Sequence, residues 1–244
     1  MYYVISDIHG CSRELKLLLN QIHFSDEDTL YILGDCVDRG PDPVGVLEIL
    51  SSYFNVFPLM GNHEFMMMKA LPPLLKASKE KDPKKAMSKE ALKACDIWLG
   101  DCGKVTLDQF QELSEEDQEF YLEYLEEMTL YEEVEVKEHS YFLIHSLPAD
   151  FQPGQSIDDL ISRPLNEILT GRPNFAADWE QDTIYIIGHT PTHKVPGAQG
   201  GKAFRKGNLI DIDCGCCTGH ALCAFCLDTQ EYTYVQAKMP EPEY

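Results

Sequence analysis

The chain has 244 residues, enough for one large domain or two small ones around a buried core. Its 44% hydrophobic and 25% charged residues are typical of a soluble globular protein, and without an apolar run of membrane-spanning length no transmembrane helix is expected. Lys and Arg number 20 against 41 Asp and Glu, and the formal net charge of −21 would repel nucleic-acid backbones and anionic membrane surfaces. We therefore expect neither nucleic acid nor a membrane as a partner.

The N-terminus and the cysteines indicate the cellular compartment in which the protein is expected. The chain enters the apolar run Tyr2–Ile5 at once and lacks the basic region and long apolar stretch of a signal peptide, so a cytoplasmic protein is expected. Its 9 cysteines form no regular framework and their number is odd. In such a chain they are expected to be reduced thiols.

The first 62 residues alternate between predicted strands and helices. Short apolar runs predict strands at 2–6, 29–33 and 55–60. Residues 12–22 place four apolar side chains on one helical face, and a second helix opened by proline is predicted at about 43–52. This β-α-β-α-β order predicts a mostly parallel sheet with covering helices.

Residues 63–128 change in character. The Lys-rich stretch 76–93, together with three nearby prolines, predicts a loop that leads into a mobile helical segment, with the lysines as a solvated face. Ser114 and Asp117 form a capping box ahead of a strongly acidic helix at 114–128. We expect a helical excursion at about 66–128 that caps the domain.

Strands resume after this excursion. Residues 130–137 and 140–144 predict a hairpin, a loop-and-helix stretch follows at 146–181, and another strand is predicted at 183–187. The last part of the chain predicts an antiparallel set of strands at 208–213, 220–227 and 231–236. No internal repeat interrupts the chain, so residues 1–244 are expected to form a single domain.

Polar side chains follow five predicted strands at the point where each strand ends. The clusters are Ser6-Asp7-Ile8-His9-Gly10, Gly34-Asp35-Cys36-Val37-Asp38-Arg39-Gly40, Gly61-Asn62-His63-Glu64, His145 and Gly188-His189-Thr190. Sites in open α/β sheets form beyond the carboxyl ends of the strands, so these groups are expected in one crevice. Each motif alone has a structural alternative, such as a buried histidine or a helix N-cap at Asn62. Their joint occurrence in order favours a functional site.

These side chains suit two cations. Carboxylate, imidazole and amide oxygen are ligands for divalent manganese, iron or zinc. Asp7 and His9 lie two residues apart in extended backbone and can face one ion, and Asp35 can bridge two ions about 3.5–4 Å apart. The sequence therefore predicts a two-metal site whose candidate ligands are Asp7, His9, Asp35, Asn62, His145 and His189.

Together the five clusters resemble the signature of the calcineurin-like metallophosphoesterases, and specifically of the phosphoprotein phosphatase branch that includes the bacteriophage lambda phosphatase. The resemblance is strong over 2–65, good over 141–190, and extends to 208–227. Residues 66–140 match loosely, although Trp98–Gly103 resembles a Trp-containing, Gly-rich turn of the family. The resemblance implies an α/β fold in which two mixed β-sheets pack as a sandwich flanked by helices, an α/β/β/α arrangement.

The resemblance also implies roles for these residues. Asp7, His9 and Asp35 would hold a first metal, and Asp35, Asn62, His145 and His189 a second, with manganese favoured over iron or zinc. A metal-bridging hydroxide would attack phosphorus in line. His63 would protonate the leaving oxygen, and Asp38 would orient the imidazole of His63.

Arginines are expected to clamp the phosphate, because a planar guanidinium suits bidentate pairing better than lysine does. The resemblance assigns Arg39 to this task and leaves a second arginine open between Arg163 and Arg172. The glycine before Arg172 and its distance from Gly188-His189 favour Arg172.

The resemblance implies a phosphomonoesterase, with phosphoserine or phosphothreonine in a phosphoprotein as the expected substrate. The alternative is symmetrical hydrolysis of dinucleoside tetraphosphates, or of another small phosphorylated molecule, by close relatives with a similar metal set. Asp38 and Glu64 favour the phosphatase, because the sister enzymes tend to lack that Asp and to end the turn in Asp. A catalytically silent metal-binding scaffold is disfavoured, because His63 and Asp38 would serve only chemistry.

The stretch 214–226 is richer in cysteine than the family needs. A zinc site built on Cys216, Cys217, Cys223 and Cys226 is one interpretation. The other is that these are core thiols, because 220–227 fits a buried strand in which positions three apart face opposite ways. The second interpretation is favoured.

Overall fold

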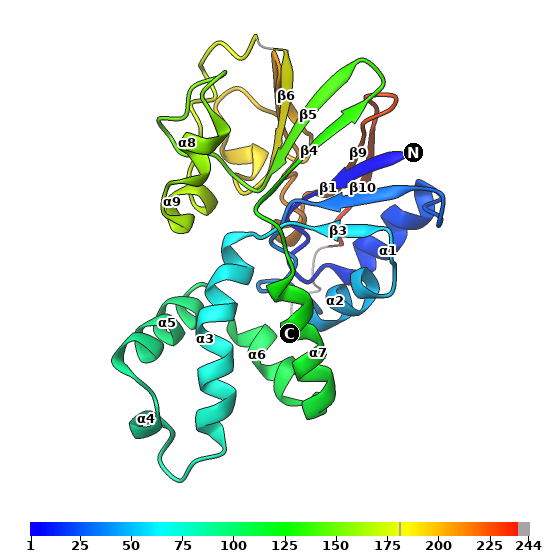
Figure 1. The fold of residues 1–244 in the computed structure, drawn as a ribbon. Helices are drawn as coiled ribbons and strands as arrows, with labels where there is room; N and C mark the ends of the chain where they lie inside the picture. The colour runs from blue at the N-terminus through cyan, green and yellow to red at the C-terminus, as the bar shows by residue number, and fades with distance from the viewer. Residues whose placement is uncertain (181, 239–244) are drawn as a thin grey trace.

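Two five-stranded sheets form the centre of the computed structural model, which describes residues 1–180 and 182–238 (Figure 1). The first sheet has the order β10-β9-β1-β2-β3, with strands β1 (Tyr2–Ile5), β2 (Thr29–Ile32), β3 (Val56–Pro58), β9 (Ala221–Cys226) and β10 (Tyr232–Gln236). The second has the order β4-β5-β6-β8-β7, with strands β4 (Tyr131–Val136), β5 (His139–Ile144), β6 (Thr183–Ile187), β7 (Phe204–Lys206) and β8 (Leu209–Asp211).

A hydrophobic layer joins the two sheets. Val4 and Phe225 of the first sheet lie in one buried cluster with Tyr141, Ile186 and Ile210 of the second. Neighbouring residues along a strand face opposite sides, so Ile5 and Phe142 belong to different clusters on the outer faces. The sheets therefore pack as a sandwich.

Helices cover both outer faces of the sandwich. The first sheet is covered by α1 (Ser12–Gln21) and α2 (Pro43–Ser51), and α8 (Ile157–Ile161) and α9 (Leu165–Leu169) lie on the side of the second. Short 3₁₀ turns, η1 (Thr192–Lys194) and η2 (Cys216–Thr218), flank β7 and β8 in the sequence. This arrangement confirms the expected α/β fold of two mixed sheets with flanking helices.

A group of five helices lies at one end of the sandwich (Figure 1). They are α3 (Asn62–Ser78), α4 (Pro83–Ala86), α5 (Lys89–Gly100), α6 (Lys104–Gln111) and α7 (Glu115–Glu126). Trp98, Phe110 and Leu125 are fully buried and belong to the same core cluster as α1 and α2. These helices, which we call the cap, therefore share a core with the first sheet. The expectation of a single domain over the whole chain stays a prediction.

One loop prediction was wrong. Helix α3 continues through Pro72 and Pro73 to Ser78, and α3, α4 and α5 together cover most of the stretch 76–93 that was expected to be a loop. A proline inside a helix removes a hydrogen bond and costs about 3 kcal/mol. Ala70, Leu71 and Ala77 are buried around the two prolines, and burial of this helix face offsets that cost.

Strand pairing was predicted only in part. Strands β1, β2 and β3 are parallel, as the alternation of the first 62 residues predicts. The expected antiparallel set over 208–236 was wrong, because β8 pairs in parallel with β6 and belongs to the second sheet. Strands β9 and β10 do form an antiparallel pair, and β9 also runs antiparallel to β1. The antiparallel partner of β8 is β7, which precedes it in the chain. The apolar pattern marks a strand but does not identify its neighbour, and the chain changes sheets between β8 and β9.

No helix of the described residues combines the length and the apolar character that crossing a bilayer requires.

Helix α1 offers a matched test of the core. Leu18 is fully buried against the first sheet, whereas its neighbour Leu17 is 41% exposed. We expect Leu18→Ala to lower the free energy of unfolding by about 2–5 kcal/mol, because it removes buried methyl groups and leaves a cavity. Leu17→Ala should change it by less than about 0.5 kcal/mol. Urea denaturation followed by circular dichroism measures both, and equal effects would contradict the assigned orientation of α1.

Candidate active site

The polar clusters follow strands of both sheets. Asp7 and His9 come after β1, Asp35 comes after β2, and Asn62 begins α3 just beyond β3. In the second sheet, His145 comes directly after β5, and His189 comes two residues after the end of β6. The site therefore forms where the carboxyl ends of the parallel strands of both sheets meet.

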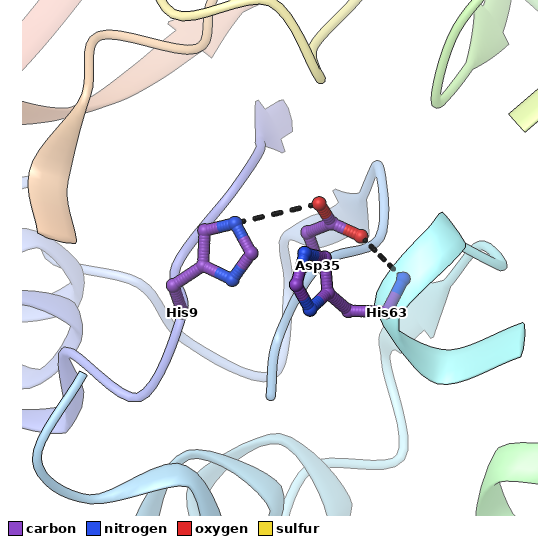
Figure 2. A group of neighbouring side chains, drawn as sticks. All are labelled: His9, Asp35 and His63. Atoms are coloured by element: carbon purple, nitrogen blue, oxygen red, sulfur yellow. Dashed lines mark hydrogen bonds and ion pairs between the residues drawn. The ribbon is translucent and has the colours of Figure 1, made fainter. Parts of the chain in front are cut away.

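Asp35 lies at the centre of a first group of side chains (Figure 2). Its Oδ2 is 3.4 Å from His9 Nε2, and its Oδ1 accepts a hydrogen bond from the backbone N–H of His63 at 3.0 Å. Donor atoms of His9, Asp35 and His63 all lie within 4.8 Å of one another. This grouping is close enough to surround one ion.

A second group shares the same carboxylate. Asp35 Oδ1 is 3.5 Å from His145 Nε2, and donor atoms of Asp35, His145 and His189 lie within 4.8 Å of one another. Asn62 Oδ1 is 3.1 Å from His145 Nε2 and 2.8 Å from His189 Nδ1. Asp35 thus belongs to both groups, which is the geometry that a bridging ligand requires.

Asp7 is held beside these groups by its neighbours. Its Oδ2 accepts hydrogen bonds from the Ser6 hydroxyl and, at 2.9 Å, from the backbone N–H of His189. A side chain at Gly188 would collide with both Ser6 and Asp7, so this close approach of β1 and β6 requires glycine. Burial raises the pKa of Asp7 to about 6.

The acceptor atoms in the site face one another, which fits cation binding. His9 Nδ1 donates to the carbonyl of Val37 and His145 Nδ1 donates to that of Leu33, so in the neutral rings both Nε2 atoms carry lone pairs. Burial lowers the pKa of His9 to about 3, which keeps that ring neutral. His145 Nε2 lies 3.1 Å from Asn62 Oδ1 and His9 Nε2 lies 3.4 Å from Asp35 Oδ2, so acceptor atoms are close neighbours here, although His9 Nε2 also has Arg39 as a donor. A divalent cation between them would turn repulsion into coordination.

The backbone is strained at the same positions. Six residues of the polar clusters other than glycine have positive φ, between 45° and 67°: Asp7, His9, Asp35, Asp38, Arg39 and His189. Such conformations persist only where the surroundings enforce them, and they concentrate at functional sites.

His63 and Asp38 form a buried pair beside the first group. His63 Nδ1 donates to Asp38 Oδ2 at 2.7 Å, while its Nε2 is buried and makes no hydrogen bond to the described residues. Burial lowers the pKa of His63, but the charge of Asp35 and the hydrogen bond to Asp38 outweigh it and raise that pKa to about 9. The pair can therefore present a proton on the free nitrogen.

The cap holds Asp38 in place. Trp98 Nε1 donates to Asp38 Oδ2 at 2.9 Å, and the Thr106 hydroxyl donates to Asp38 Oδ1 at 2.5 Å. Asp101 Oδ2 lies 3.7 Å from His63 Nε2. Only the Trp98–Gly103 turn indicated this contact in advance, because Thr106 lies in a helix that carries no recognisable motif.

Glu64 has a structural task that its motif alone did not reveal. Its buried carboxylate accepts hydrogen bonds from four backbone N–H groups, those of Asp35, Cys36, Val37 and Gly61, at 2.7–3.2 Å. It therefore faces the backbone of the loop after β2 and not the crevice.

The three candidate arginines differ in position. Arg39 Nη1 is 2.9 Å from His9 Nε2, at the edge of the first group. Arg172 is exposed and follows Gly171, whose carbonyl accepts a hydrogen bond from Ser146 beside His145. Burial, His145 and the charge of Arg172 lower the pKa of His189 to about 3. Arg163 instead pairs with Asp150, with 2.6 Å between Nη1 and Oδ1.

The cysteines of 214–226 do not gather in one place. Cys223 and Cys226 are buried in β9, whereas Cys216 lies with Cys11 and Glu14 in a group whose donor atoms are within 4.8 Å of one another. All 9 cysteines are free thiols. Both interpretations of this stretch stay predictions.

Curated relatives match part of the chain. A symmetrical bis(5'-nucleosyl)-tetraphosphatase of Proteus mirabilis is 46% identical over 68 residues, which is 27% of this chain and 25% of the relative. An enzyme of the same name from Wigglesworthia glossinidia brevipalpis is 34% identical over 100 residues, 40% of this chain and 37% of the relative. The matched stretches thus span a quarter to about two fifths of the length of these relatives.

Solved structures match nearly the whole chain in fold. One provisionally named a diadenosine tetraphosphatase has a TM-score of 0.66 at 21% identity, covering 98% of this chain and 94% of its own. A metallophosphoesterase of Sphaerobacter thermophilus has a TM-score of 0.53 at 16% identity, covering 97% and 87%.

The family model of the calcineurin-like phosphoesterases matches residues 2–223, which include every polar cluster described above. The chain belongs to the calcineurin-like phosphoesterase family.

Proposed function

We propose that this protein hydrolyses dinucleoside tetraphosphates symmetrically, at a site that holds two divalent cations. The observation that carries the proposal is the shared position of Asp35 between two groups of metal-ligand atoms. The relatives named symmetrical tetraphosphatases support the substrate class.

The earlier preference for a protein phosphatase rested on Asp38 and Glu64. Glu64 binds backbone N–H groups, and Asp38 contacts His63 and the cap, so neither side chain faces a substrate. Both residues would serve hydrolysis of any phosphoester and do not discriminate between a phosphoprotein and a nucleotide. The comparisons therefore favour the alternative that the sequence left open.

We assign the donor atoms to two ions. Asp7, His9 and Asp35 would hold one ion, and Asp35, Asn62, His145 and His189 would hold the other, with manganese favoured and iron or zinc as alternatives. His63 lies close to the first group but is assigned to proton transfer, because its Nδ1 is hydrogen-bonded to Asp38. Bound there, the cations would supply positive charge next to phosphorus and lower the pKa of the attacking water.

The remaining residues would handle phosphate and proton. Arg39 and Arg172 pair with phosphate oxygens that the cations leave free, in a chain whose net charge of −21 otherwise repels a polyanion. His63 donates its Nε2 proton to the leaving oxygen, and Asp38 keeps the ring oriented. Attack of water at an inner phosphorus breaks one P–O–P bond and releases two nucleoside diphosphates.

A comparison of substrates tests the function. The manganese-loaded protein should have a much higher kcat/KM for diadenosine tetraphosphate than for a phosphoserine peptide, with ADP as the only nucleotide product by chromatography. Asp35→Ala should abolish turnover of both and remove bound metal in elemental analysis, because it deletes the shared ligand. Faster turnover of the phosphopeptide, or full activity of Asp35→Ala, would refute the proposal.

The proposed acid role of His63 predicts a dependence on the leaving group. His63→Asn should lose about 10²–10⁴ in rate on an alkyl phosphate such as phosphoserine, whose leaving oxygen needs a proton. The loss on p-nitrophenyl phosphate, an activated aryl ester, should be much smaller. Steady-state rates at fixed metal content measure both, and equal losses would remove His63 from this role.

Arg172 and Arg163 form a matched pair for the phosphate clamp. Hydrogen bonds to charged partners contribute about 1.5–3 kcal/mol, so Arg172→Ala should lower kcat/KM about ten- to a hundredfold and weaken inhibition by free phosphate. Arg163→Ala should be nearly neutral, because Arg163 pairs with Asp150 at the surface. The reverse pattern would assign the clamp to Arg163. If both variants are neutral, Arg39 binds the phosphate without a second arginine.

A further inference from the structure

A pocket of about 460 Å³ opens directly beside the proposed second metal site. One stripe of α3 lines it, consisting of Asn62, Phe65, Met66 and Lys69. These positions lie on one face of a helix, and the rise from Asn62 to Lys69 is about 10 Å. The pocket therefore runs outward from a candidate metal ligand along the cap.

The opposite wall comes from α5, which packs against α3 (Figure 1). Lys93, Ala94 and Ile97 line this side, and Thr170, two residues before Arg172, closes the pocket near α9. Ile97 is 51% exposed and Phe65 and Met66 are only half-buried, so an apolar surface is left open to a ligand.

Positive charge accompanies this apolar surface. Lys69 Nζ lies 3.7 Å from the centre of the Phe65 ring, inside the pocket, and Lys93 lines it from the other helix. Residues 69–93 contain 8 lysines and 3 acidic residues, although the whole chain has a net charge of −21. Lys69 and Lys93 therefore place positive charge beside the apolar surface, where it can attract an anion. The expectation that the lysine run 76–93 is mainly a solvated face stays a prediction.

We propose that this pocket binds the nucleoside end of a nucleotide whose phosphate lies at the metal site, an inference that rests on the proposed function. The base packs against Phe65, Met66 and Ile97, and Lys69 and Lys93 pair with the phosphates beyond the reach of the cations. Glu90, at the rim, offers an acceptor for ribose hydroxyls or a base amino group.

The shape and chemistry favour a nucleotide over a peptide. A concave pocket of this volume is typical of small-molecule sites, and its mixture of an aromatic ring, aliphatic side chains and cations matches a flat base joined to phosphate. A phosphopeptide needs an open groove with partners for its backbone, and the α3 and α5 walls offer side chains alone, because their backbone N–H and C=O groups are used within the helices.

ADP and pyrophosphate isolate the contribution of the nucleoside, because they share the diphosphate group. Both are measured as competitive inhibitors of p-nitrophenyl phosphate hydrolysis by the manganese-loaded protein. ADP should inhibit about ten- to a hundredfold more tightly than pyrophosphate, the gain expected from stacking of one base. Phe65→Ala, Ile97→Ala and the pocket-filling Ala94→Phe should each bring the ratio of the two inhibition constants close to one.

Ile161→Ala is the matched control for Ile97→Ala, because Ile161 on α8 is 37% exposed and does not line the pocket. It should keep the wild-type ratio, and circular dichroism verifies the folding of each variant. If Phe65→Ala does not fold, the two variants on α5 decide.

Three outcomes would overturn the pocket proposal. ADP and pyrophosphate could inhibit the wild type equally, or the ratio of their inhibition constants could stay unchanged in the variants. The third is that the variants lose only their rate of phosphopeptide hydrolysis. If instead ADP shows its advantage and the variants lose it while diadenosine tetraphosphate is not hydrolysed, the pocket stands and the proposed substrate falls. The inhibition assay therefore separates the two claims.

Discussion

The site depends on the buried carboxylate of Glu64. It accepts hydrogen bonds from four backbone N–H groups, three in the loop that carries Asp35 and one at Gly61, just before Asn62 and His63. Hydrogen bonds to an ionised group are roughly twice as strong as neutral ones, and each of these N–H groups would otherwise be buried without a partner. One side chain thus fixes the loop after β2 against the start of α3, and every ligand contact around Asp35 follows from that relation.

The rest of the site combines parts that fold far apart in the sequence. The first sheet contributes Asp35, the second contributes His145, and the cap holds Asp38 through Trp98 and Thr106. The cap therefore belongs to the proposed chemistry as well as to the proposed pocket. Ile97 lines the proposed pocket and its neighbour Trp98 contacts Asp38, so α5 contributes to both.

Sequence was informative where the signal is local. Asp7, Asp35 and His189 could be placed because each stands next to a strand end, and strand ends of parallel sheets meet. Strand partners were not local: β8 and β9 are close in sequence but belong to different sheets. At Pro72, tertiary packing outweighs the low helix propensity of proline, so the helix continues. Thr106 lies far from Asp38 in the sequence and contacts it only because of the tertiary fold. The ion pair of Arg163 with Asp150 likewise could not be predicted, because no sequence pattern identifies its partner.

The positive φ angles at six site residues have a thermodynamic consequence. Each such position costs about 1–3 kcal/mol, against a total stability of about 5–15 kcal/mol for a typical domain. The loops that form the crevice therefore carry a folding cost, and the neighbouring acceptor atoms add to it. Ions that bind only the folded chain shift the balance back by mass action. The proposed ions would therefore stabilise the folded protein as well as take part in its proposed chemistry, so removing them should lower its free energy of unfolding.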